Sequence, residues 1–135
     1  MIRLTRDQMT APVREDQDFA EWYVEHVMKP HHPEFYWSLT PDGLRDRVIA
    51  ARQWARFYGL RDPAAQAHFV GMMWDVGPNF HVFPGFADVL SYRDVPEIDR
   101  VRRFLDGTVT EKQAVHAMTN ADESFWWRLP GECDG

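Results

Sequence analysis

The feature that most constrains this chain is a helical pattern, punctuated by proline and glycine, across residues 40–83. Apolar side chains recur every three or four positions from Leu44 to Tyr58, which is the spacing of one face of an α-helix. Thr40 precedes this run in a position typical of an N-cap. Gly59 follows it and suits the left-handed conformation that ends many helices. We therefore expect a helix over residues 41–58.

A second helix is predicted directly after the first. Asp62-Pro63 is a typical helix start, because aspartate caps free backbone N–H groups and proline suits the first turn. The run from Ala64 to Val76 is apolar nearly all round, which indicates a helix buried on most sides. The pair 41–58 and 63–76 should form the centre of the fold. Six of its side chains are expected in the core: Val48, Ala51, Trp54, Phe69, Met72 and Met73.

The remaining sequence also favours helices. Helical spacing returns in the first thirty residues and after Pro96, and Thr110 to Gln113 has the sequence of a capping box. No segment alternates apolar and polar residues for long enough to predict a sheet. A chain of 135 residues has the length of one domain. We expect an all-α fold, a compact orthogonal bundle of about five to seven helices. It should form a single domain over 1–135 with a frayed tail at 129–135.

The charge and composition narrow the classes of partner. The net charge is −6, from 21 acidic and 15 basic residues, and nucleic-acid binding requires a basic face. No apolar run approaches the roughly 20 residues that span a bilayer, and the N-terminus lacks the apolar core of a secretory signal. The single cysteine, Cys133, cannot form an internal disulfide. We expect a cytoplasmic protein with no membrane span and no nucleic-acid partner, whereas the charge permits a basic protein partner.

Two segments are candidates for a protein interface. Residues 29–39, KPHHPEFYWSL, contain two prolines that exclude a continuous helix, so we expect a loop whose aromatic rings fold back onto the core. The first helix carries a row of acidic side chains along its polar side. Exposed aromatic residues are frequent anchors of interfaces. The predicted partner-binding residues are Glu15, Asp18, Glu21, Glu25, His31, His32, Phe35, Tyr36 and Trp37.

The six histidines raise the alternative of a metal- or haem-binding protein or an enzyme that uses the histidine-rich loop. If a metal were bound, the candidate ligands would be His26, His31, His32 and Glu34. However, the Glu-x-x-His spacing of di-iron bundles is missing, and adjacent histidines in an extended loop diverge. We therefore predict no metal and no cofactor.

No catalytic set can be assembled from the sequence. His68 and Asp75 share one side of the second central helix, as a general base and its partner would, but we expect instead a core histidine hydrogen-bonded to a helix-capping acid. The chain has no G-x-S-x-G motif and no phosphate-binding glycine loop. Trp126 and Trp127 either close the core or form an exposed patch. We expect that the protein is not an enzyme.

One stretch resembles a known group of proteins. The run ARFYGLRDPAAQAHFVGMMWDVGPNF, with GLRDRVIAA before it and RLTRDQM near the N-terminus, is similar to small bacterial proteins encoded beside polymorphic toxins and type VI secretion cargo. The chain departs from the group at His81, where an acid is expected, and in its aromatic segment 29–37. The matching positions are Arg56, Tyr58, Gly59, Leu60, Phe69, Val70, Met73, Trp74, Gly77, Pro78 and Phe80.

The resemblance implies an accessory role, either immunity to a toxin or an adaptor or chaperone that loads an effector, and it carries over no catalytic residue. An immunity protein commonly meets its toxin with opposite charge, and a negative net charge suits a basic toxin. An adaptor would hold an effector segment in an apolar groove. The sequence therefore predicts a non-catalytic, cytoplasmic bacterial protein that binds a toxin or a secreted effector.

Overall fold

The computed structural model describes residues 12–130 and is all-α within that range. Among the described residues no strand forms, and seven α-helices contain five residues or more. The predicted fold class is therefore confirmed. The chain divides into two compact units, Met1–Ala50 and Ala51–Gly135. The prediction of a single domain over 1–135 stays a prediction. Residues 131–135 of the expected tail, and Cys133 among them, lie outside the described residues.

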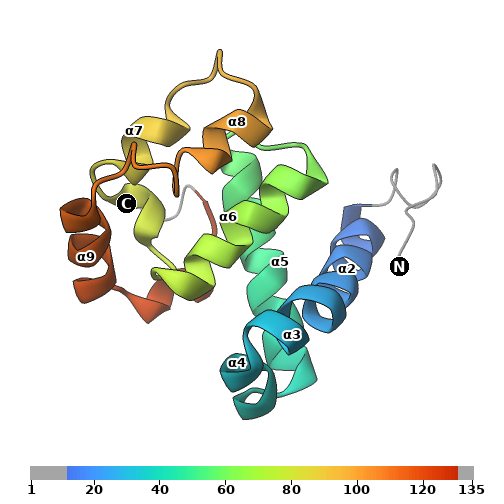
Figure 1. Ribbon diagram of the computed structural model, residues 1–135. Helices are drawn as coiled ribbons and strands as arrows, with labels where there is room; N and C mark the ends of the chain where they lie inside the picture. Colours follow the sequence, from blue (N-terminus) through green and yellow to red (C-terminus); the bar gives the residue numbers. More distant parts are fainter. Residues whose placement is uncertain (1–11, 131–135) are drawn as a thin grey trace. The chain divides into compact units, whose positions relative to one another are not determined.

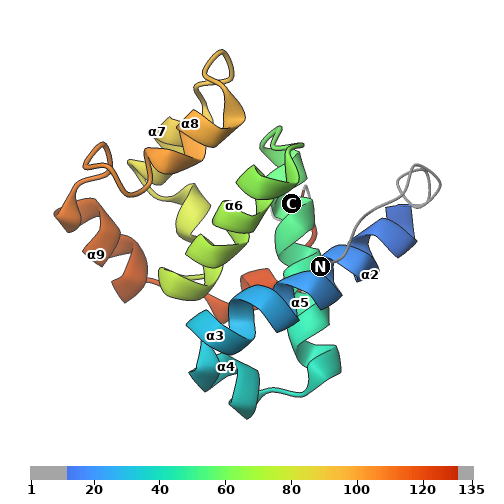
Figure 2. The same cartoon turned by 45° about the vertical axis from the view of Figure 1, so that its right-hand side comes forward.

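The first unit consists of a long helical segment, two short helices and the beginning of a second long helix (Figures 1 and 2). It contains α2 (Pro12–Tyr23), a π-helical turn (Val24–Met28), α3 (Lys29–His31), α4 (Pro33–Ser38) and the beginning of α5 (Pro41–Phe57). Both α3 and α4 pack against the π turn. The buried apolar side chains of this unit are Phe19, Ala20, Tyr23, Val24, Met28, Leu44 and Val48.

The prolines of residues 29–39 act differently from the prediction, and the expected loop is wrong. The helix does not stop before Pro30, because the turn immediately before it widens to π geometry, with the backbone N–H of Lys29 donating to the carbonyl of Val24. A proline ring clashes with the carbonyl four residues earlier in a regular α-helix, and a widened turn relieves that clash. Pro33 does break the helix, since His32 leaves the α region at φ −132° and ψ 55°.

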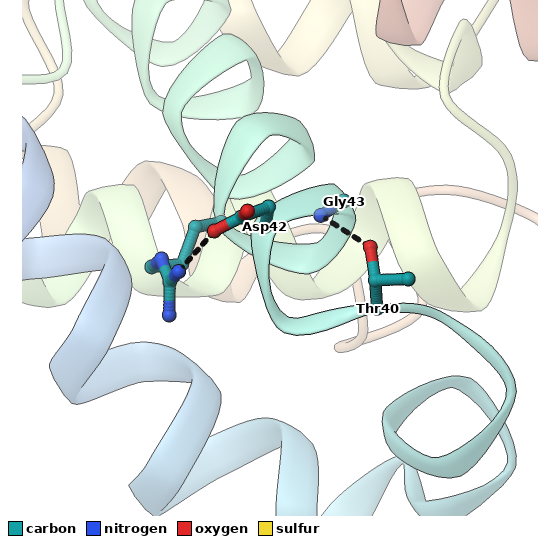
Figure 3. Close-up of polar contacts among 4 residues, drawn as sticks. Thr40, Asp42 and Gly43 are labelled. Carbon is teal, nitrogen blue, oxygen red and sulfur yellow. Dashed lines mark hydrogen bonds and ion pairs between the residues drawn. The ribbon is translucent and has the colours of Figure 1, made fainter.

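Helix α5 begins as the sequence predicts. The backbone N–H of Gly43 donates to the hydroxyl oxygen of Thr40 at 3.0 Å, so Thr40 is the N-cap (Figure 3). Asp42 lies in the positively polarised first turn, where a carboxylate is stabilised, and it pairs with the guanidinium of Arg45. The helix ends at Phe57, and Gly59 takes the positive φ of +83° that a left-handed stop requires.

The second unit begins with the last turns of α5. It also contains α6 (Pro63–Asp75), many of whose side chains are buried. Figure 1 shows α7 and α8 side by side, and α8 also packs against α6. The N-cap of α6 is Asp62, whose carboxylate accepts the backbone N–H of Ala64 at 2.9 Å, as predicted. The other elements are a 3₁₀ turn (Phe80–Val82), α7 (Phe86–Leu90), α8 (Glu97–Arg102), α9 (Glu111–Thr119) and a second 3₁₀ turn (Glu123–Trp126).

The predicted core positions are confirmed in both units. All six side chains expected to be buried are buried: Val48, Ala51, Trp54, Phe69, Met72 and Met73. The capping box of α9 also forms, with the backbone N–H of Gln113 donating to the Thr110 hydroxyl at 3.1 Å and the side-chain oxygen of Gln113 accepting the N–H of Thr110 at 2.9 Å.

Two side chains of α5 depart from the burial that its helical spacing predicts, which places Arg52 on the polar side and Phe57 on the apolar side. Arg52 is buried rather than solvated, and its Nε–H donates to the side-chain oxygen of Gln66 on α6 at 2.7 Å. The amide of Gln66 in turn donates to the carbonyl of Leu60 at 2.9 Å. Phe57, expected on the buried face, is 52% exposed. The buried arginine is tolerated because its polar atoms are hydrogen-bonded, and the pairing ties the last turns of α5 to α6.

The adjacent tryptophans near the C-terminus have different surroundings. Trp126 is buried and its ring centroid lies 4.6 Å from that of Trp74, whereas Trp127 is 62% exposed. One ring therefore closes the core and the other lies on the surface. In the range 12–130, no helix combines the length and the apolar character needed to cross a membrane.

Candidate functional site

A cleft of about 460 Å³ opens in the first unit, and every residue that lines it belongs to that unit. Its walls are α2 with the π turn, α4, and the beginning of α5. This volume lies within the range of ligand-binding sites in proteins, roughly 300–1,000 Å³. The lining residues are Glu21, Val24, Glu25, Tyr36, Trp37, Leu39, Pro41, Leu44 and Arg45.

Two aromatic rings from α4 form one wall of the cleft. The ring centroids of Tyr36 and Trp37 are 4.9 Å apart and their planes meet at 84°. Tyr36 is half-buried, whereas Trp37 is 75% exposed and does not fold back onto the core as expected. A tryptophan this exposed on the wall of a cleft presents a large apolar face to any partner that enters.

Two carboxylates also line the cleft. Glu21 lies on α2 and Glu25 in the π turn, four residues apart, and both side chains are exposed. The basic group in the lining, Arg45, is paired with Asp42 on its own helix (Figure 3). The cleft therefore has an excess of negative charge beside an aromatic wall. It joins two sets of residues that the sequence placed in separate candidate surfaces.

The other predicted partner-binding residues do not line the cleft. Glu15, Asp18 and Phe35 are half-buried, and His31 is exposed. His32 is buried, with its ring 6.2 Å from that of Phe35. Their part in partner binding stays a prediction.

The candidate metal ligands are not assembled into a binding site. His26, His31 and Glu34 are exposed, while His32 is buried. Among residues 12–130, no group of three histidine, cysteine, aspartate or glutamate side chains could hold a metal ion. The alternative of a metal- or haem-binding protein or an enzyme stays untested.

In the second unit, both ring nitrogens of His81 lie within hydrogen-bond distance of polar groups. The Nδ1 atom of His81 lies 2.7 Å from the hydroxyl of Tyr58, and Nε2 lies 3.1 Å from the carbonyl of Pro78. A carbonyl only accepts, so Nε2 carries the hydrogen and Nδ1 of the neutral ring accepts from the tyrosine hydroxyl. Burial is the largest cause that lowers the pKa of His81 to about 3, against a smaller raising effect of the Pro78 carbonyl.

The surroundings of His81 are those of a structural residue. Its ring lies 4.6 Å from that of Trp54 and 5.6 Å from that of Phe69, and it is fully buried. A general base must reach the proton that it removes from a substrate. Because both ring nitrogens of His81 are engaged inside the core, we assign it a role in holding Tyr58 and the Pro78 turn together.

The other histidine–acid pair that the sequence suggested is not in the core. His68 and Asp75 are both exposed on α6, so the expectation of a buried, hydrogen-bonded histidine there is wrong. Neither residue lines the cleft. Nothing in their placement favours a general-base site.

Sequence reasoning missed part of the cleft. The lining residues that the sequence does not predict as site residues are Val24, Leu39, Pro41, Leu44 and Arg45. The available signal was Pro41, because a proline-initiated helix directly after an aromatic segment places its first turn beside those rings.

Comparison with known protein families, with curated proteins and with solved structures gives no match.

Proposed function

We propose that this chain is a non-catalytic accessory protein that binds another protein, and that the cleft of the first unit is its contact surface. The observation that carries the proposal is the cleft itself, which is lined by the exposed ring of Trp37 and by the carboxylates of Glu21 and Glu25. Exposed tryptophan at a concave site is typical of an interface anchor. An apolar wall bordered by charge suits a macromolecular partner better than a reaction that needs activated groups.

The partner that we propose is a bacterial toxin or secreted effector encoded beside this chain, with the protein acting inside the cell. Two features support this proposal: the similarity of residues 55–80 to accessory proteins of toxin and type VI secretion loci, and the net charge of −6, which favours a basic partner. Immunity and effector loading are the two roles within this proposal. They differ in what binding does to the partner.

The proposal is tested by co-expression with the products of the neighbouring genes, followed by purification of the complex. We expect a complex, and Trp37→Ala should weaken it by at least about tenfold, as loss of an interface anchor does. The matched control is Trp127→Ala, which removes another exposed tryptophan outside the cleft. Rescue of growth by the complex would indicate immunity, and a more stable or better secreted partner without rescue would indicate an adaptor. Failure to bind either neighbour, or equal affinities of the two variants, would overturn the proposal.

A further inference from the structure

The charged side chains of the cleft favour a positively charged ligand. Glu21 and Glu25 lie one helical turn apart, and among the described residues no hydrogen bond or ion pair engages either carboxylate. Arg45 is the basic residue in the lining and is paired with Asp42. The cleft therefore holds two uncompensated carboxylates. A cation that enters gains attraction to both, whereas a phosphate or carboxylate is repelled.

The rings add a second preference for a cation. The faces of aromatic rings attract positive charge, most strongly in tryptophan. The chain already shows this attraction at the neighbouring ring, where the ammonium of Lys29 lies 5.8 Å from the centroid of Tyr36. The ring of Trp37 stands at 84° to that of Tyr36 and is 75% exposed, so it offers its surface to an incoming group.

The combination of a flat ring and two carboxylates favours arginine over lysine. A guanidinium is planar, stacks on an aromatic face and donates two parallel hydrogen bonds to a carboxylate, whereas an ammonium is a compact and strongly hydrated charge. The lining also contains apolar residues, which suit the methylene stem of a long side chain: Val24, Leu39, Pro41 and Leu44. A volume of about 460 Å³ accommodates such a side chain and part of its neighbours.

The π turn places one of the two carboxylates. Glu25 lies within Val24–Met28, where the helix is wider than an α-helix, and Glu21 lies in the regular turn before it. Such single π turns inside helices are frequent at binding sites. Glu25 thus belongs to a locally specialised piece of backbone rather than to an ordinary charged helix face.

We infer that the cleft binds an arginine side chain presented by the protein partner, with the guanidinium stacked on Trp37 and hydrogen-bonded to Glu21 or Glu25. This inference rests on the proposed function and specifies the chemistry of the partner. It predicts that partner binding weakens as salt concentration rises, because the contact is partly exposed.

The experiment uses the full chain and three acetylated, amidated peptides that are identical except at one central position between leucines. That position holds arginine, lysine or citrulline, the last being a neutral analogue of arginine with nearly the same shape. Binding is followed up to millimolar peptide through the indole N–H resonance of Trp37, which Trp37→Phe assigns. We expect the arginine peptide to bind at least about tenfold more tightly than the citrulline peptide, and the lysine peptide to be intermediate.

Two variants separate the cleft from general electrostatics. Glu21→Gln combined with Glu25→Gln should abolish the preference for arginine over citrulline, whereas Glu34→Gln, an exposed acid of α4 outside the cleft lining, should preserve it. Equal binding of the arginine and citrulline peptides, or no shift of the Trp37 resonance with any peptide, would overturn the arginine site. If the peptide results overturn the arginine site but Trp37→Ala still weakens the complex with the neighbouring gene product, the inference alone falls and the proposed function stands. Absence of any such complex overturns the proposed function instead.

Discussion

The neutral, buried His81 makes the stability of the second unit depend on pH in a way that can be calculated. In the folded chain, burial lowers the pKa of His81 from 6.5 to about 3. The unfolded chain therefore takes up a proton on this ring as the pH falls below 6.5, while the folded chain does not. Stability from this residue is complete above pH 6.5 and is lost progressively as the pH falls towards 3.

The size of the effect follows from linkage. Each pH unit in this window costs about 1.4 kcal/mol of unfolding free energy. Between about pH 7.5 and about pH 5, the unfolded ring gains most of its proton, and the expected loss is about 2 kcal/mol. Over the whole window down to pH 3 the loss would reach roughly 4–5 kcal/mol. That is a large part of the roughly 5–15 kcal/mol that stabilises an ordinary domain.

The assay is urea unfolding of wild type and His81→Gln at the two pH values, with the difference between pH values compared for each protein. His81→Gln removes the titrating ring, so its loss of stability over this interval should be smaller than that of wild type by about 2 kcal/mol. The variant's absolute stability does not enter this comparison. His68→Gln, which replaces an exposed histidine of α6, serves as the control and should behave as wild type. Equal pH dependence of wild type and His81→Gln would refute the assignment of a neutral, buried ring.

Two further predictions concern the second unit. Gly85→Ala should destabilise more than Gly107→Ala: both glycines have positive φ, +91° and +97°, but a Cβ at Gly85 would lie 2.6 Å from the side-chain oxygen of Gln113, whereas nothing lies within 4 Å at Gly107. Chemical unfolding should give about 1–3 kcal/mol for the backbone strain alone at Gly107 and about 1 kcal/mol more at Gly85; the reverse order would contradict the argument. Trp126→Ala should cost about 3–5 kcal/mol as a core truncation and Trp127→Ala about 0.5 kcal/mol or less. Similar losses for the two tryptophans in the same assay would show that Trp127 is not a surface residue.

The parts of the fold that were predictable are those fixed by local pattern. The bounds of α5 and α6 follow from the helical spacing of apolar residues, from the N-cap residues and from the residues that end each helix. The capping and ending signals lie within one turn of each helix end. The burial of Arg52 could not be predicted in this way. It depends on Gln66, fourteen residues away on another helix, and the helical spacing of α5 assigns Arg52 to the polar side. A periodic pattern reports which side is apolar and cannot identify a polar partner in the core.

The candidate site was predictable in its residue types but not in its assembly. The sequence predicts Trp37, Tyr36 and the acids Glu21 and Glu25 as partner-binding residues, because aromatic and charged side chains are frequent at interfaces. The sequence placed the rings on a loop and the acids on a helix, with no indication that they share a cleft. That juxtaposition depends on the path of the chain between Met28 and Thr40, where the sequence rule for proline predicts only a break in the helix.

The prolines determine how the cleft is built. Pro30 is accommodated by the π turn that carries Glu25, Pro33 begins the helix that carries Tyr36 and Trp37, and Pro41 begins α5 and itself lines the cleft. Each proline fixes one backbone angle at a wall of the site. A site whose walls are restrained before binding loses little conformational entropy when a partner enters, so a modest number of contacts can give useful affinity. The prolines of this short segment therefore reduce the conformational entropy that is lost when the carboxylates and the rings of the cleft bind a partner.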